Sequence, residues 1–227
     1  MSMQIELLQR KTTQIFEDCW LMPDFLTVEA QGEMLADIRR WTKEAGGLHA
    51  PLMPNGTPMN HSLRGLGWDW VPYHYEEIRR ELPQELIVLA NQALYLVDES
   101  IRDRYTPFNP DTALVNWFPL GSSLGSHQDK SEDDSLVYGG SPIVTLAIGA
   151  ACDLYVGGDD RGDPMTKVEM RSGDIFVMAG TSRRRFHEVR RILPDTTPPD
   201  LSMKTEGRIS VTIRRAKAPH QEIQPAR

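Results

Sequence analysis

The C-terminal half of this 227-residue chain is a series of short β-type segments separated by turn residues. Such spacing is typical of a sandwich or barrel, because each strand is followed at once by a turn that can return the chain. Between two of the segments, Arg171-Ser172-Gly173-Asp174 predicts a hairpin turn. We expect long loops at 130–141 and 194–207. The predicted strands are Leu114–Phe118, Ile143–Ile148, Asp153–Val156, Lys167–Met170, Ile175–Met178 and Arg208–Arg214.

The N-terminal half favours helices instead. Apolar residues recur at helical spacing over Val28–Ala45, and the glycines at 46 and 47 supply a stop. A second helix is predicted over Pro83–Arg104, where apolar residues return to one face. Residues 48–75 are rich in Gly, Pro, Asn and aromatic side chains, which favours irregular loops and short strands. The fold class expected is therefore α+β.

The composition is that of an ordinary soluble protein, with 40% hydrophobic and 25% charged residues. One domain over residues 1–227 is expected, since a chain of this length can bury a single substantial core. No stretch approaches the roughly 18 apolar residues of a membrane span, and the N-terminus lacks the apolar centre of a signal peptide. Cys19 and Cys152 have neither metal-type nor redox-type spacing. We therefore expect a cytoplasmic monomer that binds no membrane.

The net charge of −7 argues against a strong general affinity for nucleic acid, because such affinity comes from neutralising phosphates. The charge is nevertheless uneven: it is +3 over residues 151–227 and −10 over the rest of the chain. The basic part includes the run Arg183-Arg184-Arg185 and the pair Arg190-Arg191. Because the local potential governs binding to one face, the composition permits an anionic partner without requiring one.

Two short motifs suggest a metal site. The chain reads Ser126-His127-Gln128-Asp129 and, sixty residues after that histidine, His187 follows Arg185-Phe186. Side chains two apart on a strand leave the same face, so His127 and Asp129 can converge on one ion. Two histidines and a carboxylate fill one face of an octahedral Fe(II) and leave other positions open. The alternatives are a surface His-x-Asp and, for His187, a core histidine bonded to the backbone. The remaining histidines have no comparable context and are expected to be ordinary loop or surface residues: His49, His61, His74 and His220.

The last predicted strand carries a second pattern. Ile209, Val211 and Ile213 alternate with a polar set, so the two sets leave opposite faces of the strand. One interpretation is an amphipathic strand whose arginines face water. With a metal motif present, an interior face bearing arginines can instead clamp a dicarboxylate, since guanidinium and carboxylate form two parallel hydrogen bonds. The polar set is Arg208, Ser210, Thr212 and Arg214.

Together these motifs resemble the AlkB family of Fe(II)- and 2-oxoglutarate-dependent dioxygenases. The resemblance implies a double-stranded β-helix (jelly-roll) core over residues 111–227 with helices packed on one side. It also implies a helical, aromatic-rich substrate-recognition extension, or lid, over residues 1–110. The matching motifs, in order, are Asn116-Trp117-Phe118-Pro119, His127-Gln128-Asp129-Lys130, Gly173-Asp174, Arg183 with His187, and Arg208 with Arg214; the weaker ones are Pro23-Asp24-Phe25-Leu26 and Gly65-Leu66-Gly67-Trp68.

By the same resemblance, His127, Asp129 and His187 would hold Fe(II). Arg214 would steady the C1 carboxylate of 2-oxoglutarate and Arg208 would pair with the distal C5 carboxylate. Roughly 20 Å of strand separates the two arginine backbones, so their side chains must lean together or one must play a supporting role. Arg214 could instead orient Asp129.

The other implied co-substrate residues are Asn116 at the C1 end and two positions that depart from the family. The family usually has tyrosine at Phe118 and asparagine at Ser210, and both would have bonded the distal carboxylate. A lost hydrogen bond costs about 1 kcal/mol. We therefore expect 2-oxoglutarate to bind more weakly than is usual in the family, unless Thr212 or a water substitutes.

The activity implied is oxidative demethylation of N-alkylated nucleobases in DNA, as in DNA repair, with O2 consumed and formaldehyde and succinate released. The base must leave the duplex or come from a single strand, which calls for flat stacking partners. Trp68 fits that role, whereas Trp70 is expected to pack the lid. Arg161 could contact the lesion or a phosphate, or be purely structural. The residues expected to bind substrate are Trp68, Tyr73, Tyr75, Ser131 and Arg161.

Three alternatives remain open for the target and the activity. The same chemistry could act on RNA or on a protein side chain. A catalytically silent relative could keep the fold and use the aromatic residues to bind nucleic acid. The expected partner is alkylated single- or double-stranded DNA, with RNA as the alternative.

Overall fold

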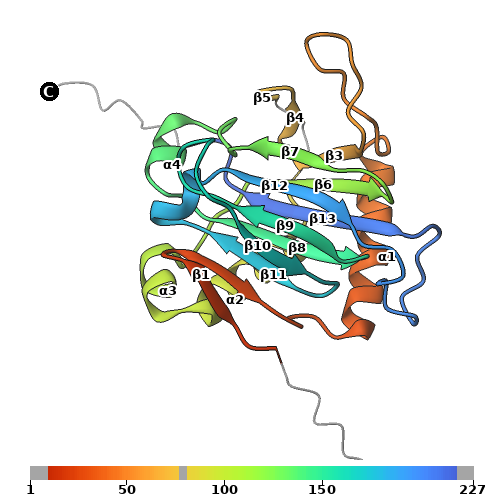
Figure 1. The fold of residues 1–227 in the computed structure, drawn as a ribbon, viewed down its shortest axis with the longest axis horizontal. Coiled ribbons are helices and arrows are strands. Elements are labelled where there is room, and N and C mark those ends of the chain that lie inside the picture. The colour runs from red at the N-terminus through yellow and green to blue at the C-terminus, as the bar shows by residue number, and fades with distance from the viewer. Residues whose placement is uncertain (1–9, 77–80, 219–227) are drawn as a thin grey trace, which may run out of the picture.

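The computed structural model describes residues 10–76 and 81–218 (Figure 1). In this part of the chain the strands form one large antiparallel sheet, a smaller one and a two-stranded ribbon. The large sheet contains β1 (Thr13–Phe16), β2 (Cys19–Met22), β3 (Ser62–Gly67), β6 (Thr112–Pro119), β8 (Ile143–Gly149), β11 (Ile175–Met178) and β13 (Gly207–Arg214). The small sheet contains β7 (Leu124–His127), β9 (Cys152–Val156), β10 (Thr166–Met170) and β12 (His187–Ile192), and the ribbon pairs β4 (Asp69–Val71) with β5 (His74–Glu76).

Non-consecutive strands lie side by side in both sheets, so the chain crosses repeatedly between them. The order is β1-β2-β11-β8-β13-β6-β3 in the large sheet and β10-β9-β12-β7 in the small one. The predicted strands are all present, and their ends agree with the prediction within two residues. The α+β class is therefore confirmed.

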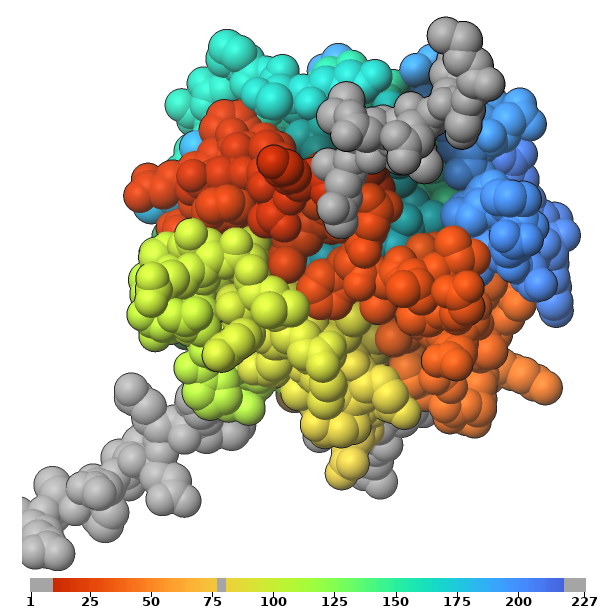
Figure 2. Space-filling view, turned by 90° about the horizontal axis from the view of Figure 1, so that it is seen from below, coloured from red at the N-terminus to blue at the C-terminus, as the bar shows by residue number. Residues whose placement is uncertain are grey.

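The helices cover one face of the large sheet (Figure 2). They are α1 (Val28–Glu44), α2 (Gln84–Val97) and α3 (Glu99–Tyr105), while α4 (Asp134–Tyr138) and a 3₁₀ turn (Gly180–Arg184) lie in connections. Thr27 caps α1 by accepting a hydrogen bond from the backbone N–H of Ala30. The predicted helix over Pro83–Arg104 is two helices: Asp98 is extended, ends α2, and caps α3 by accepting from Ser100 N at 2.9 Å. Asp favours such caps over helix interiors, which explains the break.

The core has two layers. In the outer layer, Ile209, Val211 and Ile213 of β13 pack with apolar side chains of α1 and α2. In the inner layer, apolar residues of the two sheets meet. Arg208 and Arg214, on the other face of β13, are buried as well. The interpretation of β13 as a strand with solvent-facing arginines is therefore wrong, and its polar face is interior.

The turn Arg171–Asp174 does not make a hairpin. It joins β10 of the small sheet to β11 of the large sheet, so the chain changes layer there. Buried Asp174 accepts hydrogen bonds from Arg171 N at 2.8 Å and from both terminal nitrogens of Arg10. The strand that pairs with β10 is β9. The hairpin prediction is therefore wrong: the four residues form a turn, but the strands on its two sides belong to different sheets, and Arg10 of the N-terminal segment binds the turn's Asp174.

Several elements carry too little periodicity to be predicted from the sequence. The long loop expected at residues 130–141 contains the short helix α4. The loop expected at residues 194–207 is confirmed except for Gly207, which begins β13. Within the described residues, no helix has both the length and the apolar character needed to cross a bilayer. The short strands expected somewhere in residues 48–75 are β3, β4 and most of β5, although their bounds were not predicted. The unpredicted strands are β1, β2, β7 and β12.

Candidate metal centre

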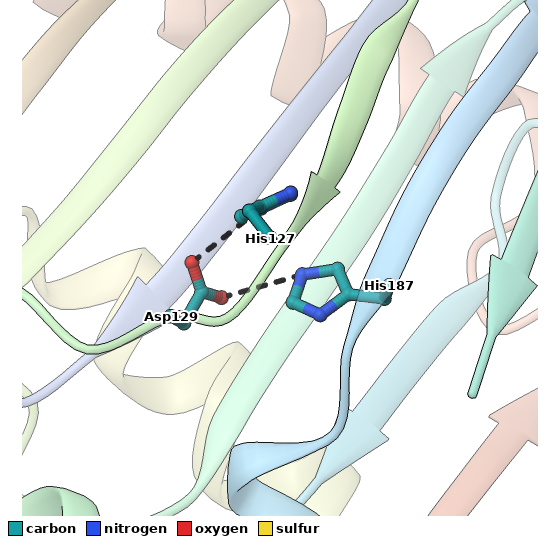
Figure 3. A group of neighbouring side chains, drawn as sticks. All are labelled: His127, Asp129 and His187. Atoms are coloured by element: carbon teal, nitrogen blue, oxygen red, sulfur yellow. Dashed lines mark ion pairs between the residues drawn. The ribbon is translucent and has the colours of Figure 1, made fainter. Parts of the chain in front are cut away.

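Two paired strands of the small sheet bring the predicted metal ligands together (Figure 3). His127 ends β7 and His187 begins β12, and the two residues are direct partners in the antiparallel register. Asp129 follows in the loop after β7. Its carboxylate oxygens lie 3.8 Å from His127 Nε2 and 3.7 Å from His187 Nε2. Potential ligand atoms of the three residues all lie within 4.8 Å of one another, close enough to hold one ion.

Backbone carbonyls orient both imidazoles. Nδ1 of His127 lies 2.9 Å from Gly125 O, and Nδ1 of His187 lies 3.1 Å from Arg185 O. A ring that donates through Nδ1 leaves Nε2 free as a ligand. His187 is thus the backbone-bonded buried histidine of the alternative interpretation, yet its other nitrogen faces Asp129.

The protonation states suit a metal. Burial, and then the neighbouring His127, lower the pKa of His187 to about 4, so its imidazole is neutral at neutral pH. Burial alone would raise the pKa of Asp129, but the charges of Arg214, His187, His127 and Arg183 outweigh it and hold that pKa well below its usual value. Two imidazole nitrogens and an ionised carboxylate form a donor set that fits Fe(II), and the neutral imidazole of His187 is ready to bind it.

Asp129 also belongs to a buried charge network. Arg214 Nη1 lies 3.1 Å from Asp129 Oδ1 and 2.6 Å from Glu132 Oε1. Arg183 Nη2 lies 3.0 Å from Glu132 Oε2, and Arg183 Nη1 donates to the backbone oxygen of Asp129. Two arginines thus face two carboxylates, which keeps the set formally neutral before a metal binds. Arg214 lies against Asp129, as the alternative interpretation of its role expects. Glu132 was not predicted, because a carboxylate near a metal motif is usually a surface residue.

Arg208 lies at the other end of β13 and has no such partner. Its side chain is buried, at 2% exposure, and Nη1 donates to the carbonyls of Ala150 and Met170 at 3.3 Å each. No carboxylate within residues 10–76 and 81–218 lies within ion-pair distance of it. A buried guanidinium that has only carbonyl partners favours an anionic ligand.

The other predicted co-substrate residues lie between the two arginines. In the pairing of β13 with β6, Ser210 is opposite Asn116 and Arg208 is opposite Phe118. Thr212 is buried on the same face as Ser210. These side chains form a row along β13 and β6, called the β13–β6 row below. It runs from Arg214, beside the metal ligand Asp129, past Ser210 and Asn116 to Arg208.

His61 is a further buried side chain at this row, and the expectation that it is an ordinary loop or surface residue is wrong. It is 4% exposed and its ring stacks on that of Phe118. Nothing in the sequence around it indicates this, because the neighbouring strand β3 is short and contains two glycines. His49 and His74 are exposed, as expected, and His220 lies outside the described residues.

The aromatic residues of the ribbon are divided between packing and exposure. Trp70 Nε1 donates to Ser131 Oγ at 3.0 Å. Tyr75 is buried, and its hydroxyl lies 3.5 Å from Glu132 Oε1. Tyr73, by contrast, is 67% exposed. The ribbon is therefore fastened to the loop that follows the metal motif.

Trp68 and Arg161 each contact a cation or ring outside the metal set. The ammonium of Lys217 lies 5.6 Å from the Trp68 ring centroid. Arg161 donates to Ser126 O at 3.0 Å and lies over the ring of Phe186, 5.1 Å from its centroid. Arg161 thus contacts both segments that carry the histidine ligands, as its structural role requires. A guanidinium has five N–H donors, so others remain for an anion.

Comparison with known proteins identifies similar chains. The family model described as the 2OG-Fe(II) oxygenase superfamily matches residues 18–214. An alpha-ketoglutarate-dependent dioxygenase AlkB homolog from Caulobacter vibrioides is 31% identical over 88% of this chain and 87% of its own length. The solved structure of OsALKBH1 superposes with a TM-score of 0.79 at 25% identity, covering 90% of this chain and all of that one.

Two eukaryotic relatives differ in the substrate that their names state. The DNA N(6)-methyladenine demethylase ALKBH1D of Arabidopsis thaliana is 27% identical over 86% of this chain and 48% of its own. The tRNA demethylase abh1 of Schizosaccharomyces pombe is 29% identical over 59% of this chain and 42% of its own. This chain therefore spans about half the length of these relatives.

Proposed function

The chain belongs to the 2OG-Fe(II) oxygenase superfamily and is an AlkB homologue, and on that premise we propose that it oxidatively demethylates N-alkylated bases in nucleic acid, DNA first. The observation that carries the proposal is the row of buried and half-buried side chains that runs from the metal ligands along β13 and β6 to Arg208. It has a two-histidine, one-carboxylate set at one end and, at the other, Arg208, which pairs with no carboxylate of the described residues. A dicarboxylate that chelates a metal through one end requires both features.

In this proposal each residue of the row has one task. His127, Asp129 and His187 hold Fe(II), and Arg214 keeps Asp129 ionised and oriented. Asn116 steadies the C1 carboxylate, and Arg208 pairs with the C5 carboxylate. When bound, iron and 2-oxoglutarate use O2 to hydroxylate the N-methyl group, which leaves as formaldehyde while succinate and CO2 form.

The protein then has to present the base and exclude water. We assign the jelly-roll core to residues 111–227 and the substrate-recognition extension to residues 1–110. Trp68 is the stacking partner of the base, and Tyr73 is an exposed contact for flanking nucleotides. Tyr75, buried against Glu132, supports the ribbon instead. Ser131 and Arg161 complete the substrate side.

RNA is the second candidate substrate, favoured by the relative named as a tRNA demethylase. The uneven charge of the chain suits either nucleic acid, since both present a phosphate backbone. The repaired base therefore has to be identified by experiment.

The test is mass spectrometry of short single-stranded oligonucleotides bearing 1-methyladenine, 3-methylcytosine or N6-methyladenine, each in a DNA and an RNA version. They are incubated with protein, Fe(II), 2-oxoglutarate and ascorbate. We expect loss of the mass of one methylene from at least one DNA substrate. His127→Ala should abolish that loss, because the metal set is then incomplete.

The outcomes separate the candidates. Loss from RNA alone would replace DNA with RNA as the substrate. Succinate formed without any demethylation would retain the dioxygenase and reject these bases. Neither product would favour a nucleic-acid-binding protein without catalysis.

A further inference from the structure

His61 is a buried polar residue to which the proposed mechanism gives no task. It directly precedes β3, the strand that pairs with β6 beside Asn116. Its ring lies face to face with Phe118, with centroids 4.5 Å apart and planes 27° apart. The side chains of Asn116 and His127 are electrostatic neighbours of the ring, and Asn116 lies two residues from Phe118 on β6, so both leave the same face of the strand. His61 therefore contacts the middle of the row between the metal ligands and Arg208.

A packing role alone does not account for an imidazole here. Burial, and then His127, lower the pKa of His61 to about 4, so the ring is neutral at neutral pH and has one donor and one acceptor nitrogen. Its hydrogen-bond partner among the described residues is Asn60, whose Oδ1 lies 3.4 Å from Nδ1. Phenylalanine or leucine would fill the space without burying polar nitrogens. The ring nitrogens thus have a function beyond filling volume.

We propose that His61 is a positioning residue for 2-oxoglutarate, which fixes the side-chain amide of Asn116 toward the C1 end of the co-substrate. The inference rests on the assignment of Asn116 made above. Phe118 and Ser210 flank Asn116 but offer the co-substrate no phenol and no amide. Asn116 is consequently the amide of this stretch. Its Nδ2 lies 3.5 Å from Leu114 O, a long hydrogen bond, and an amide held this weakly loses much of its value as a ligand contact. Stacking on Phe118 fixes the orientation of the His61 imidazole, and the imidazole in turn fixes the orientation of the Asn116 amide.

The test measures co-substrate binding rather than turnover. 2-Oxoglutarate is titrated anaerobically into the Fe(II)-loaded protein, and the metal-to-ligand charge-transfer absorption reports the bound fraction. His61→Phe keeps a stacked ring and removes both nitrogens. We expect it to weaken 2-oxoglutarate binding about tenfold, the effect of one hydrogen bond to a charged group. Mn(II) affinity, measured separately, should not change, and neither should binding by the control His49→Phe at an exposed site.

Two further measurements exclude a merely structural role. Pyruvate has the C1 carboxylate and keto oxygen but lacks the distal carboxylate, so His61→Phe should weaken pyruvate binding by a similar factor. Asn116→Ala and the double variant His61→Phe/Asn116→Ala should bind 2-oxoglutarate equally, because His61 acts through Asn116. His61→Gln, which retains a donor and an acceptor, should recover most of the affinity and is the variant to use if the phenylalanine variant fails to fold.

Three results would overturn the proposal: unchanged affinity in His61→Phe, a loss confined to 2-oxoglutarate, or additive losses in the double variant. Because the readout is binding, failure to demethylate any oligonucleotide leaves this test intact.

Discussion

Buried charged residues beside the candidate metal centre need a partner of opposite charge for the fold to be stable. Glu132 lies between Arg183 and Arg214, and its side chain is shielded from solvent. A buried charge is tolerated only when it is paired, so removing one partner leaves another uncompensated. We expect Glu132→Gln to lower the free energy of unfolding by about 3 kcal/mol, measured by urea denaturation of the metal-free protein.

The matched control for that prediction is an exposed pair. Glu99 is 81% exposed and lies 3.0 Å from Arg102. Glu99→Gln should cost less than about 1 kcal/mol, because water screens the interaction. Similar losses in the two variants would mean that burial of Glu132 does not determine its contribution.

In the proposed site, Arg208 pairs with the distal carboxylate of the co-substrate. Its replacement by alanine removes a charged, bidentate donor and leaves an interior cavity. We expect Arg208→Ala to weaken 2-oxoglutarate binding at least about 100-fold in the anaerobic titration, since hydrogen bonds to charged groups contribute about 1.5–3 kcal/mol each. Arg171→Ala, at an exposed arginine, is the control. Unchanged affinity in Arg208→Ala would place the C5 carboxylate elsewhere.

At the scale of secondary structure, the sequence predicted what depends on local periodicity. The alternation in β13 predicted the strand and its two faces, because residues two apart leave the same face. That its arginines face the interior was expected only because the metal motif was present as well. His127 and Asp129 were found because a motif of three residues contains them. His61 and Glu132 could not be found in this way, since each acquires its role from a segment distant in sequence: β6 for His61 and β13 for Glu132.

The turn before β11 is the clearest case of a local signal with a non-local outcome. Gly173 has φ +83°, and a Cβ there would lie 2.4 Å from Gln31 Nε2 and 2.7 Å from Leu26 O. Glycine is thus required both by backbone conformation and by the approach of the segment that begins α1. The hairpin prediction considered the first requirement alone, whereas the second comes from a segment about 140 residues earlier in the chain.

Gly173→Ala should therefore destabilise the protein by about 2 kcal/mol, since strain and steric overlap act together. Gly47→Ala is the matched control, because Gly47 also has a positive φ, +86°, but a Cβ at that position would meet no atom within 4 Å. It should lose only about 1 kcal/mol. Thermal unfolding of the two variants distinguishes strain from packing, and equal losses would show that the contact with α1 is unimportant.

For the molecule as a whole, the fold buries ionisable groups that a metal and a dicarboxylate can use. Glu132 and three arginines are buried and the Asp129 side chain is 13% exposed, while the helices cover one face of the large sheet with mainly apolar residues. Stability has to come mainly from the apolar packing of both layers, because buried ion pairs contribute little net free energy. The ionisable groups of the inner layer should make the free energy of unfolding depend on pH.

The stability of the metal-free protein should accordingly fall as the solution is acidified. His61 and His187 have pKa values of about 4 in the folded chain against an ordinary value of 6.5. Between those values the unfolded chain binds more protons than the folded one, so protonation favours unfolding. The lowered pKa of Asp129 acts in the same direction below about pH 4.

We expect the free energy of unfolding to drop by about 2 kcal/mol between about pH 7 and about pH 4.5, after allowance for solvent screening. Urea denaturation in the presence of a chelator measures it. His61→Phe should reduce this pH dependence, since a residue that cannot take up a proton in either state contributes no slope. A profile that is flat, or that rises toward acid, would show that the two imidazoles titrate normally in the folded protein and that the interior between the sheets is open to water.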